Sequence, residues 1–271
     1  DGGQIVPPHD LGIVEEAKRI ESPSQIQRDP SPQPYRPIKE ELDAAYLKEL
    51  KKHQLLPPLP LKILYTNLHG TGIRLVPKAL ASWGYEELSL VEPQAPLDGN
   101  FSNAPSPNPE EEKALHLGTK LLVEEKQDLL IATDPDADRV GIATLHEGQA
   151  VRLTGNQTAC LLLYHLAQTL SSQKKMPPSP AFVKTIVTTE LFAKIARHFQ
   201  GALFDVLTGF KYIGELIETW DQTKAHHFVF GAEESYGSLF GTFVRDKDAI
   251  SASCLIAEMA AYAKREGKSL L

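Results

Sequence analysis

The sequence predicts an α/β protein with two consecutive three-layer domains, each built on a mixed, mainly parallel sheet. Two observations support this prediction. Short apolar strands alternate with amphipathic helical stretches from residue 61 to residue 264. The chain of 271 residues is also longer than a usual single domain, and its 42% hydrophobic and 23% charged content is ordinary for globular proteins. We place the boundaries at residues 1–36, 37–153 and 154–271.

The leading segment is expected to contain a short helix and a linker. Asp10 is a suitable N-cap for a helix over residues 11–20. Five prolines between residues 23 and 37 predict a loop or linker over residues 21–37. Residues 38–53 then have the spacing of an amphipathic helix, whose predicted buried face carries Ile38, Leu42, Ala45, Tyr46 and Leu50.

The remaining elements alternate in the manner of βαβ units. In the first domain we expect strands at 61–65 and 86–91 around a helix at 73–83, then a helix at 110–125, a strand at 128–132 and a hairpin of 140–145 with 150–153. In the second we expect helices at 155–170, 190–199, 211–220 and 246–264, with strands at 181–187, 203–206 and 226–230. Loops that follow parallel strands should therefore gather at one edge of each sheet, where open α/β sheets bind ligands.

Composition excludes several classes of protein. The formal net charge is −7 and no basic stripe is visible, which argues against a nucleic-acid-binding protein. No apolar run approaches the length of about 18 residues that spans a bilayer. The two cysteines, Cys160 and Cys254, lie in apolar helical patterns and are expected to be buried thiols. We expect a cytoplasmic protein with no membrane or nucleic-acid partner.

The strongest chemical signal is an acidic loop, residues 134–139, directly after the strand predicted at 128–132. Asp134, Asp136 and Asp138 repel one another unless a cation neutralises them. Carboxylates without histidine or cysteine favour a hard divalent ion, so the loop predicts a Mg²⁺ site with these three side chains as ligands. A solvated acidic turn is the ordinary alternative, and the repulsion makes it the weaker one.

An EF-hand and an aspartyl phosphatase also place aspartates at alternate positions of a loop. An EF-hand requires Gly at loop position six and Glu at position twelve, where this chain has Arg139 and Leu145, so the loop is not an EF-hand. In a phosphatase with an aspartyl nucleophile, Asp-x-Asp follows a strand, and Asp134 would then form an acyl phosphate. The phosphatase therefore remains the alternative chemistry at this point.

Two further loops end predicted strands of the second domain. Residues 231–237 present Glu233 and Ser235 on a Gly-flanked loop, and such groups suit the hydroxyls of a sugar. Residues 208–214 open a helix, so Lys211, Gly209 and free backbone N–H groups would face an anion. Taken alone, the 231–237 loop is about equally well explained as a helix cap with solvated glutamates. For the 208–214 loop, a surface lysine in a first helical turn is the more common case.

The remaining polar segments are expected to have structural roles. Residues 245–248 have the pattern of a solvated charge run at a helix start, and we assign them no catalytic role. His69 is a tempting general base in its loop, but a histidine whose ring is satisfied by the backbone is the expected case. The same expectation applies to His226 and His227.

Taken in order, these stretches resemble the α-D-phosphohexomutase family, which includes phosphoglucomutase and phosphomannomutase. The acidic loop resembles the family's metal loop, with Pro135 where Gly is common. The loops at 208–214 and 231–237 resemble its third-domain substrate loop and its sugar-binding loop. Residues 65–72, 107–110 and 245–248 also fit the family, and residues 1–10 resemble the segment after the catalytic serine loop of its larger members.

The resemblance implies a four-domain enzyme of which this chain holds the end of domain 1 and the complete domains 2 and 3. The family's Ser-His-Asn loop and its Arg-x-Ser-Gly-Thr phosphate loop do not occur in the 271 residues. Such an enzyme moves a phosphoryl group between the 1- and 6-positions of a hexose phosphate through a phosphoserine and a sugar bisphosphate. The resemblance therefore implies sugar phosphates and the missing domains 1 and 4 as partners, and a chain that is inactive by itself.

The resemblance also assigns roles to residues. Arg139 and Lys211 are expected to act in catalysis, Arg139 by positioning the phosphate. Gly209, Lys211, Glu233 and Ser235 are expected to bind the sugar phosphate. Phosphopentomutase activity within the same family and a non-catalytic sugar-phosphate-binding relative stay open beside the hexose mutase and the phosphatase.

Overall fold

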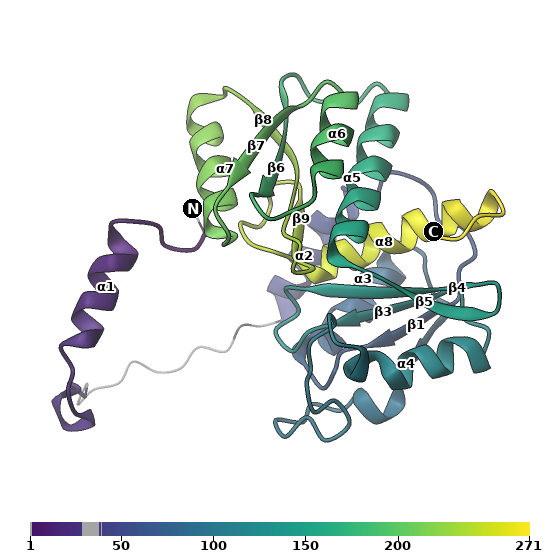
Figure 1. Ribbon diagram of the computed structural model, residues 1–271, viewed down its shortest axis with the longest axis horizontal. Coiled ribbons are helices and arrows are strands. Elements are labelled where there is room, and N and C mark those ends of the chain that lie inside the picture. The colour runs from purple at the N-terminus through teal and green to yellow at the C-terminus, as the bar shows by residue number, and fades with distance from the viewer. Residues whose placement is uncertain (1, 29–37, 39) are drawn as a thin grey trace.

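The first of two sheets has five strands. The computed structural model describes residues 2–28, 38 and 40–271 (Figure 1). In the first sheet the strand order is β2-β1-β3-β4-β5, with β1 parallel to β2 and β3 and with β4 antiparallel to both of its neighbours. These strands are β1 (Ile63–Thr66), β2 (Leu88–Leu90), β3 (Leu129–Thr133), β4 (Val140–His146) and β5 (Gln149–Leu153).

The second sheet has the order β7-β6-β8-β9, in which only the β8–β9 pair is antiparallel. Its strands are β6 (Pro180–Thr185), β7 (Ala202–Val206), β8 (His227–Ala232) and β9 (Ser238–Phe240). Across both sheets, four of the described strand pairs are parallel and three are antiparallel. The predicted fold class, two α/β units with mixed and mainly parallel sheets, is confirmed.

Helices cover both faces of each sheet, as the nearly continuous burial of the central strands β1, β3, β6 and β8 requires. Leu64, Leu130 and Ala143 belong to one hydrophobic cluster with Leu122 of α4, whereas Ile63 and Ile131 belong to another with residues of α3 and α8. Figure 1 shows α4 on one face of this sheet and α3 and α8 on the other. In the second sheet α7 covers one face, and α5 and α6 the other. The helices are α2 (Glu40–Lys51), α3 (Val76–Ser82), α4 (Glu112–Glu124), α5 (Gly155–Ser172), α6 (Glu190–His198), α7 (Lys211–Thr223) and α8 (Ala249–Arg265), with short 3₁₀ turns at Thr71–Arg74 and Glu92–Gln94.

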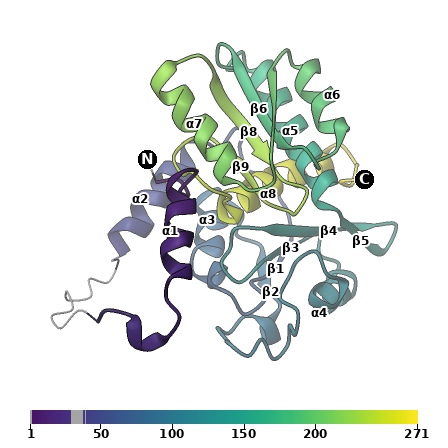
Figure 2. The same ribbon diagram turned by 60° about the vertical axis from the view of Figure 1, so that its left-hand side comes forward.

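The leading segment differs from its prediction. Helix α1 (His9–Lys18) begins before Asp10, because the Gly12 N–H already donates to the Pro8 carbonyl and no side chain caps the helix. The predicted cap at Asp10 is therefore wrong, and its carboxylate instead pairs with Lys211 on α7. Figure 2 shows the N-terminal end of α1 near α7. Part of the predicted linker, residues 29–37, lies outside the described residues, while Pro23–Gln25 forms a 3₁₀ turn.

Helix α2 confirms the prediction of a helix after the linker but not its full buried face. Leu50 is buried and Tyr46 is half-buried. Ile38 and Leu42 are 69% and 57% exposed, because only the C-terminal part of the helix packs on the core. Ala45 is exposed as well, so the predicted buried side is wrong for Ile38, Leu42 and Ala45.

Helix α8 lies between the two sheets and joins their cores. In Figure 1 it runs as the yellow helix beneath the second sheet and above the first. Twelve of its residues are buried, and one hydrophobic cluster includes its side chains together with strand residues of both sheets. Among the buried residues are Cys160 on α5 and Cys254 on α8, both unpaired thiols as predicted. The domain boundaries stay a prediction, since α8 belongs to the second unit by sequence and packs on the first.

Glu258, in the middle of α8, is fully buried and ties three segments together. Its Oε2 accepts the backbone N–H groups of Leu55 and Leu56 at 3.0 and 2.9 Å, and its Oε1 lies 2.9 Å from Nε2 of His165 on α5. Alanine at this position would remove the acceptor of two part-buried N–H groups and the partner of His165. Glu258→Ala is therefore expected to lower the free energy of unfolding by about 2 to 3 kcal/mol.

Urea unfolding followed by circular dichroism measures this loss. Glu266→Ala serves as the matched control, since the side chain of Glu266, the residue after α8, is in an exposed ion pair with Lys268 and its removal should leave the unfolding midpoint nearly unchanged. Equal midpoints for the two variants would contradict the role assigned to Glu258.

Within the described residues, no helix is both long enough and apolar enough to span a membrane.

Candidate metal centre and adjoining loops

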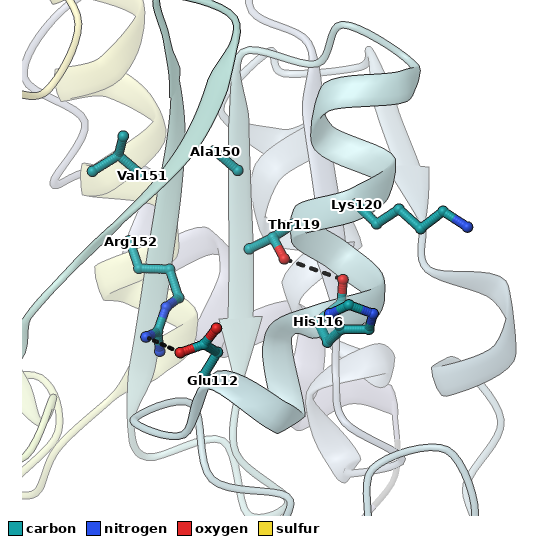
Figure 3. Close-up of a pocket in the computed structure, with 7 residues that line it drawn as sticks. All are labelled: Glu112, His116, Thr119, Lys120, Ala150, Val151 and Arg152. Carbon is teal, nitrogen blue, oxygen red and sulfur yellow. Dashed lines mark hydrogen bonds and ion pairs between the residues drawn. The ribbon is translucent and has the colours of Figure 1, made fainter.

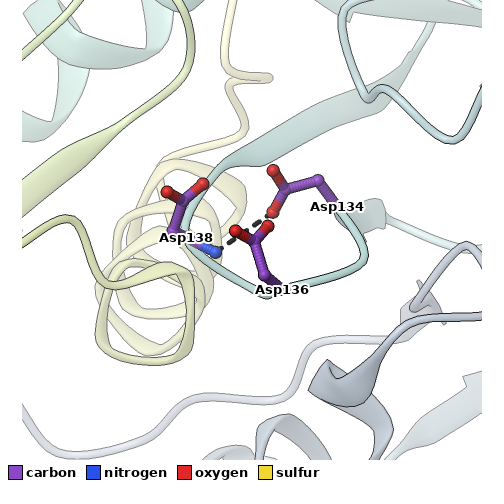
Figure 4. Close-up of side chains that lie close together, drawn as sticks. All are labelled: Asp134, Asp136 and Asp138. Carbon is purple, nitrogen blue, oxygen red and sulfur yellow. Dashed lines mark hydrogen bonds between the residues drawn. The ribbon is translucent and has the colours of Figure 1, made fainter. Parts of the chain in front are cut away.

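The acidic loop is a tight turn that brings its three carboxylates together. Asp134 follows the buried strand β3, and Ala137 turns the chain with a left-handed φ of 60°. Ligand atoms from Asp134, Asp136 and Asp138 all lie within 4.8 Å of one another (Figure 4). Asp136 is exposed and Asp138 is half-buried. The convergence expected from the sequence is present in the described part of the chain.

Asp134 organises this turn from its base. The side chain is 1% exposed, and its Oδ1 accepts the backbone N–H groups of Asp138 and Arg139, each at 3.0 Å. Its Oδ2 accepts Nε of Arg139 at 2.7 Å. Burial raises the pKa of Asp134 to about 6, against the opposing effect of the bonds from Arg139 and with the repulsion of the two neighbouring carboxylates. A cation at the loop would relieve that repulsion.

The donor set fits a hard divalent ion. Three carboxylates supply only oxygen, and a site with few protein ligands leaves positions for water or phosphate oxygens, as Mg²⁺ prefers. Arg139 lies beside the carboxylates, bound to Asp134 and 3.3 Å from Glu110. The loop thus combines a cluster of oxygen ligands for a cation with a guanidinium that suits phosphate.

The loop after β1 braces the acidic loop. The backbone N–H and the hydroxyl of Thr71 both donate to the carbonyl of Pro135, at 2.7 and 3.0 Å. Gly70 packs directly against the same residue. Pro135 is therefore held at a fixed position relative to the first sheet, and the turn of the three aspartates is held with it.

Of the three histidines whose rings were expected to be satisfied by the backbone, two meet that expectation. His69 is buried, with Nδ1 2.8 Å from the Pro96 carbonyl and Nε2 accepting the Asn103 N–H at 3.1 Å. His227 Nδ1 lies 2.6 Å from a backbone carbonyl. His226 packs among aromatic rings and its Nδ1 has no hydrogen-bond partner among the described residues, so the expectation of a backbone-satisfied ring was wrong there.

The loop at residues 231–237 touches the acidic loop through the backbone. Arg139 and Gly237 form an antiparallel bridge, and the Val140 N–H donates to the Tyr236 carbonyl at 3.1 Å. Glu233 is buried, which raises the pKa of its carboxyl, and its Oε1 accepts the Gly209 N–H at 3.0 Å. Ser235 is half-buried at the tip. The structure thus brings 134–139, 231–237 and Gly209 together.

Lys211 lies at the start of α7 and forms an ion pair with the leading segment instead of contacting the other site loops. Its Nζ is 2.8 Å from Asp10 Oδ2 on α1, and this partner holds the pKa of the lysine above its ordinary value. Of the two residues predicted to act in the 208–214 loop, Gly209 therefore contacts the second site loop, and Lys211 contacts the leading segment.

The charge run at residues 245–248 is not the solvated segment that was predicted. Lys247 Nζ lies 3.0 Å from Asp138 Oδ2 and 2.9 Å from Asp246 Oδ1, and its side chain is only 12% exposed. Asp248 is buried and caps α8 by accepting the N–H groups of Ile250 and Ser251. The interpretation as a solvated run is wrong because the run lies between β9 and α8, over the acidic loop.

Lys247 is thus a site residue that sequence reasoning missed. The order of elements could have indicated it. Residues 245–248 directly precede α8, and α8 starts beside the sheet edge that carries the acidic loop. Glu234 was also missed, and its Oε2 accepts the Thr185 hydroxyl at 2.9 Å, which anchors the 231–237 loop to β6.

A separate hollow of about 460 Å³ lies between α4 and β5, away from these loops (Figure 3). Its basic groups do not converge on one point. Arg152 is paired with Glu112 at 3.3 Å, and Lys120 points away from the hollow, 3.8 Å from Glu124. This hollow contains no residue of the acidic loop or of its neighbours, and the charges in it are already paired.

Comparison with known proteins agrees with this arrangement. Residues 44–148 match the family model of the phosphoglucomutase/phosphomannomutase α/β/α domain II, and residues 154–271 match that of domain III. The chain is 38% identical over 216 residues to a phosphoglucomutase of Staphylococcus haemolyticus, a match that covers 79% of this chain and 38% of that protein. The chain thus spans about two fifths of the length of this relative.

Solved structures show the same fold. The crystal structure of a putative phosphomannomutase from Thermus thermophilus superposes with a TM-score of 0.67 at 25% identity, over 84% of this chain and 48% of that one. A mutase variant from Aspergillus fumigatus, solved in complex with glucose 1,6-bisphosphate, superposes with a TM-score of 0.56 at 14% identity, over 84% and 47% of the two chains. The two family models together match most of the chain, and the protein therefore belongs to the phosphoglucomutase/phosphomannomutase family.

Proposed function

We propose that this chain supplies the metal loop and the sugar-binding loop of a phosphosugar mutase. The complete enzyme would move a phosphoryl group between the 1- and 6-positions of a hexose phosphate, through an enzyme phosphoserine and a sugar bisphosphate. The observation that carries the proposal is the backbone bridge between Arg139 and Gly237, which joins the acidic loop to the 231–237 loop. A metal-stabilised phosphate and the hydroxyls of a sugar would then share one site.

The acidic loop would hold Mg²⁺ through Asp134, Asp136 and Asp138. The ion supplies positive charge that offsets the charge of a phosphoryl group in transfer. Arg139 is positioned by Asp134 and Glu110 and would orient a phosphate oxygen through its guanidinium. This division places the cation and the guanidinium on the same phosphoryl group.

Binding of the sugar would fall to Glu233, Ser235, Gly209 and Lys211. The Glu233 carboxylate is held by the Gly209 N–H and keeps further acceptor capacity for sugar hydroxyls. Lys211 would offer its ammonium to an anionic group once separated from Asp10. Contacts to hydroxyls that occur in both orientations of the ligand would allow one site to bind either end of the bisphosphate.

The aspartyl-nucleophile phosphatase is the less favoured chemistry. Both carboxylate oxygens of Asp134 accept hydrogen bonds, and the side chain is 1% exposed. A nucleophile must present an unhindered oxygen in line with the phosphorus atom, whereas a metal ligand needs only one remaining lone pair on one oxygen. Phosphate release by this chain that disappears in Asp134→Asn would support the phosphatase instead.

Calorimetric titration of the chain with Mg²⁺ or Mn²⁺ tests the metal loop, at a pH well above the Asp134 pKa of about 6. Asp136→Asn removes one exposed ligand and is expected to lower the affinity about a hundredfold without changing stability. A phosphoserine peptide is added if the chain alone binds weakly.

Asp43→Asn is the matched control, because it removes the same charge from an ion pair with Arg74 that includes no residue of the acidic loop. Its affinity should stay within about twofold of that of the unchanged chain. Equal affinities for the chain and Asp136→Asn, with the peptide present, would rule out the three-aspartate site.

A further inference from the structure

Lys247 places a fixed positive charge against one of the three predicted metal ligands. Its Nζ is 3.0 Å from Asp138 Oδ2, and its side chain is 12% exposed. The ammonium also lies 2.9 Å from Asp246 and 5.4 Å from the ring centre of Phe210. Lys247 is therefore enclosed by groups that favour its charge in this position.

The segment that carries Lys247 is anchored from the far side by α2 and the turn after it. The Tyr46 hydroxyl donates to Asp248 Oδ2 at 2.6 Å, next to Lys247 in the chain. Phe243, in the same segment, stacks on His53 at 4.8 Å between ring centres and packs against Tyr46 at 5.9 Å. These contacts hold the backbone of the segment in place, so the ammonium reaches Asp138 without further ordering.

A divalent cation at Asp138 would meet this ammonium at close range. Mg²⁺ binds carboxylate oxygen at about 2.1 Å, so an ion on the oxygen that Lys247 contacts would lie within about 5 Å of Nζ. Charges of +2 and +1 at that separation repel enough, even at the dielectric constant of water, to weaken binding about tenfold. Lysine and metal ion are therefore alternatives at this carboxylate.

We propose that Lys247 is the counter-cation of the metal loop, which neutralises Asp138 in the metal-free chain and is displaced from it when a divalent ion binds. The inference rests on the proposed metal function of the three aspartates. It assigns to Lys247 the role of setting metal affinity, and it makes the ammonium available to other anionic groups of the site only in the metal-loaded state.

Titration of the chain with Mn²⁺ by calorimetry tests this role without any activity assay. Lys247→Met keeps the length and apolar stem of the side chain and removes its charge, and it is expected to bind Mn²⁺ about tenfold more tightly. Lys247→Arg keeps the charge and should retain the affinity of the unchanged chain within about threefold. Thermal unfolding of each variant shows whether the fold is kept.

Lys264→Met is the matched control, since Lys264 belongs to α8 and pairs with Asp128 at 2.6 Å, away from the acidic loop. It should bind Mn²⁺ as the unchanged chain does. Unchanged or weaker binding by Lys247→Met, with binding by the parent chain intact, would overturn the role of Lys247 and leave the metal site standing. Absence of saturable binding in the parent and in every variant would overturn both.

Discussion

Replacing Gly70 with alanine is expected to displace the acidic loop and to lower its affinity for Mg²⁺ or Mn²⁺ by about a hundredfold or more. A Cβ atom at this position would lie 2.2 Å from Cα and 2.5 Å from the carbonyl oxygen of Pro135. Both are backbone atoms, so no side-chain rotation relieves the overlap. The loop after β1 and the acidic loop must separate.

The separation also has a cost in stability. Thr71 donates two hydrogen bonds to the Pro135 carbonyl, and both are lost when the loops move apart. Together with the strain of an overpacked contact, this is expected to reduce the free energy of unfolding by about 3 kcal/mol or more. Calorimetric titration and urea unfolding of the same variant measure the two effects.

Gly99→Ala is the control, because a Cβ there meets no heavy atom within 4 Å. It should keep both the metal affinity and the unfolding midpoint of the parent chain. A Gly70→Ala protein with the affinity of the parent would show that the acidic loop does not depend on its contact with the loop after β1.

The convergence of the three aspartates was predictable from sequence because they are neighbours in the chain. Three aspartates at alternate positions after an apolar strand need only a tight turn to converge, and the turn at Ala137 provides it. The sheet edge that carries the loop was also predictable, since strand and helix periodicities extended over whole elements. Sequence patterns were therefore sufficient to predict contacts between residues that are close together in the chain.

Contacts between distant segments were not predictable in this way. Lys247 contacts Asp138 because α8 packs on both sheets and its start lies next to the acidic loop. The hydrophobic periodicity of a single segment does not indicate which distant segment it packs on. The same holds for Asp10, whose partner Lys211 lies far along the chain. Strand β9 was missed for a different reason, since its three residues lie between Gly237 and Gly241, and a Gly-flanked segment of this length is typical of a loop.

Buried polar residues show a related limit. Glu233 was expected to face a sugar, and part of its carboxylate is in fact used to hold Gly209. Glu234 had no predicted role of its own, yet it anchors the loop to Thr185. A pair of adjacent glutamates has the same sequence signature whichever of them points inward, so the division of their roles required the structure.

Gly155→Ala is expected to have a comparably large effect on the 231–237 loop. Gly155 begins α5, and a Cβ there would lie 2.0 Å from the Glu234 carbonyl oxygen and 2.9 Å from the Tyr236 nitrogen. The overlap is again with backbone, so the loop must move from its anchor on β6. We expect the free energy of unfolding to fall by about 3 kcal/mol or more in urea denaturation, with Gly99→Ala unchanged.

The same variant tests whether the two loops form one site. Tyr236 accepts the Val140 N–H directly after the acidic loop, so movement of the 231–237 loop should pull on that loop and weaken Mn²⁺ binding as well. A Gly155→Ala protein that remains folded but binds Mn²⁺ less tightly would show that the backbone bridge transmits the displacement. If its affinity equals that of the parent chain, the metal loop is positioned by the first sheet and Pro135 alone, and the shared site must depend on the bound ligand rather than on the bridge.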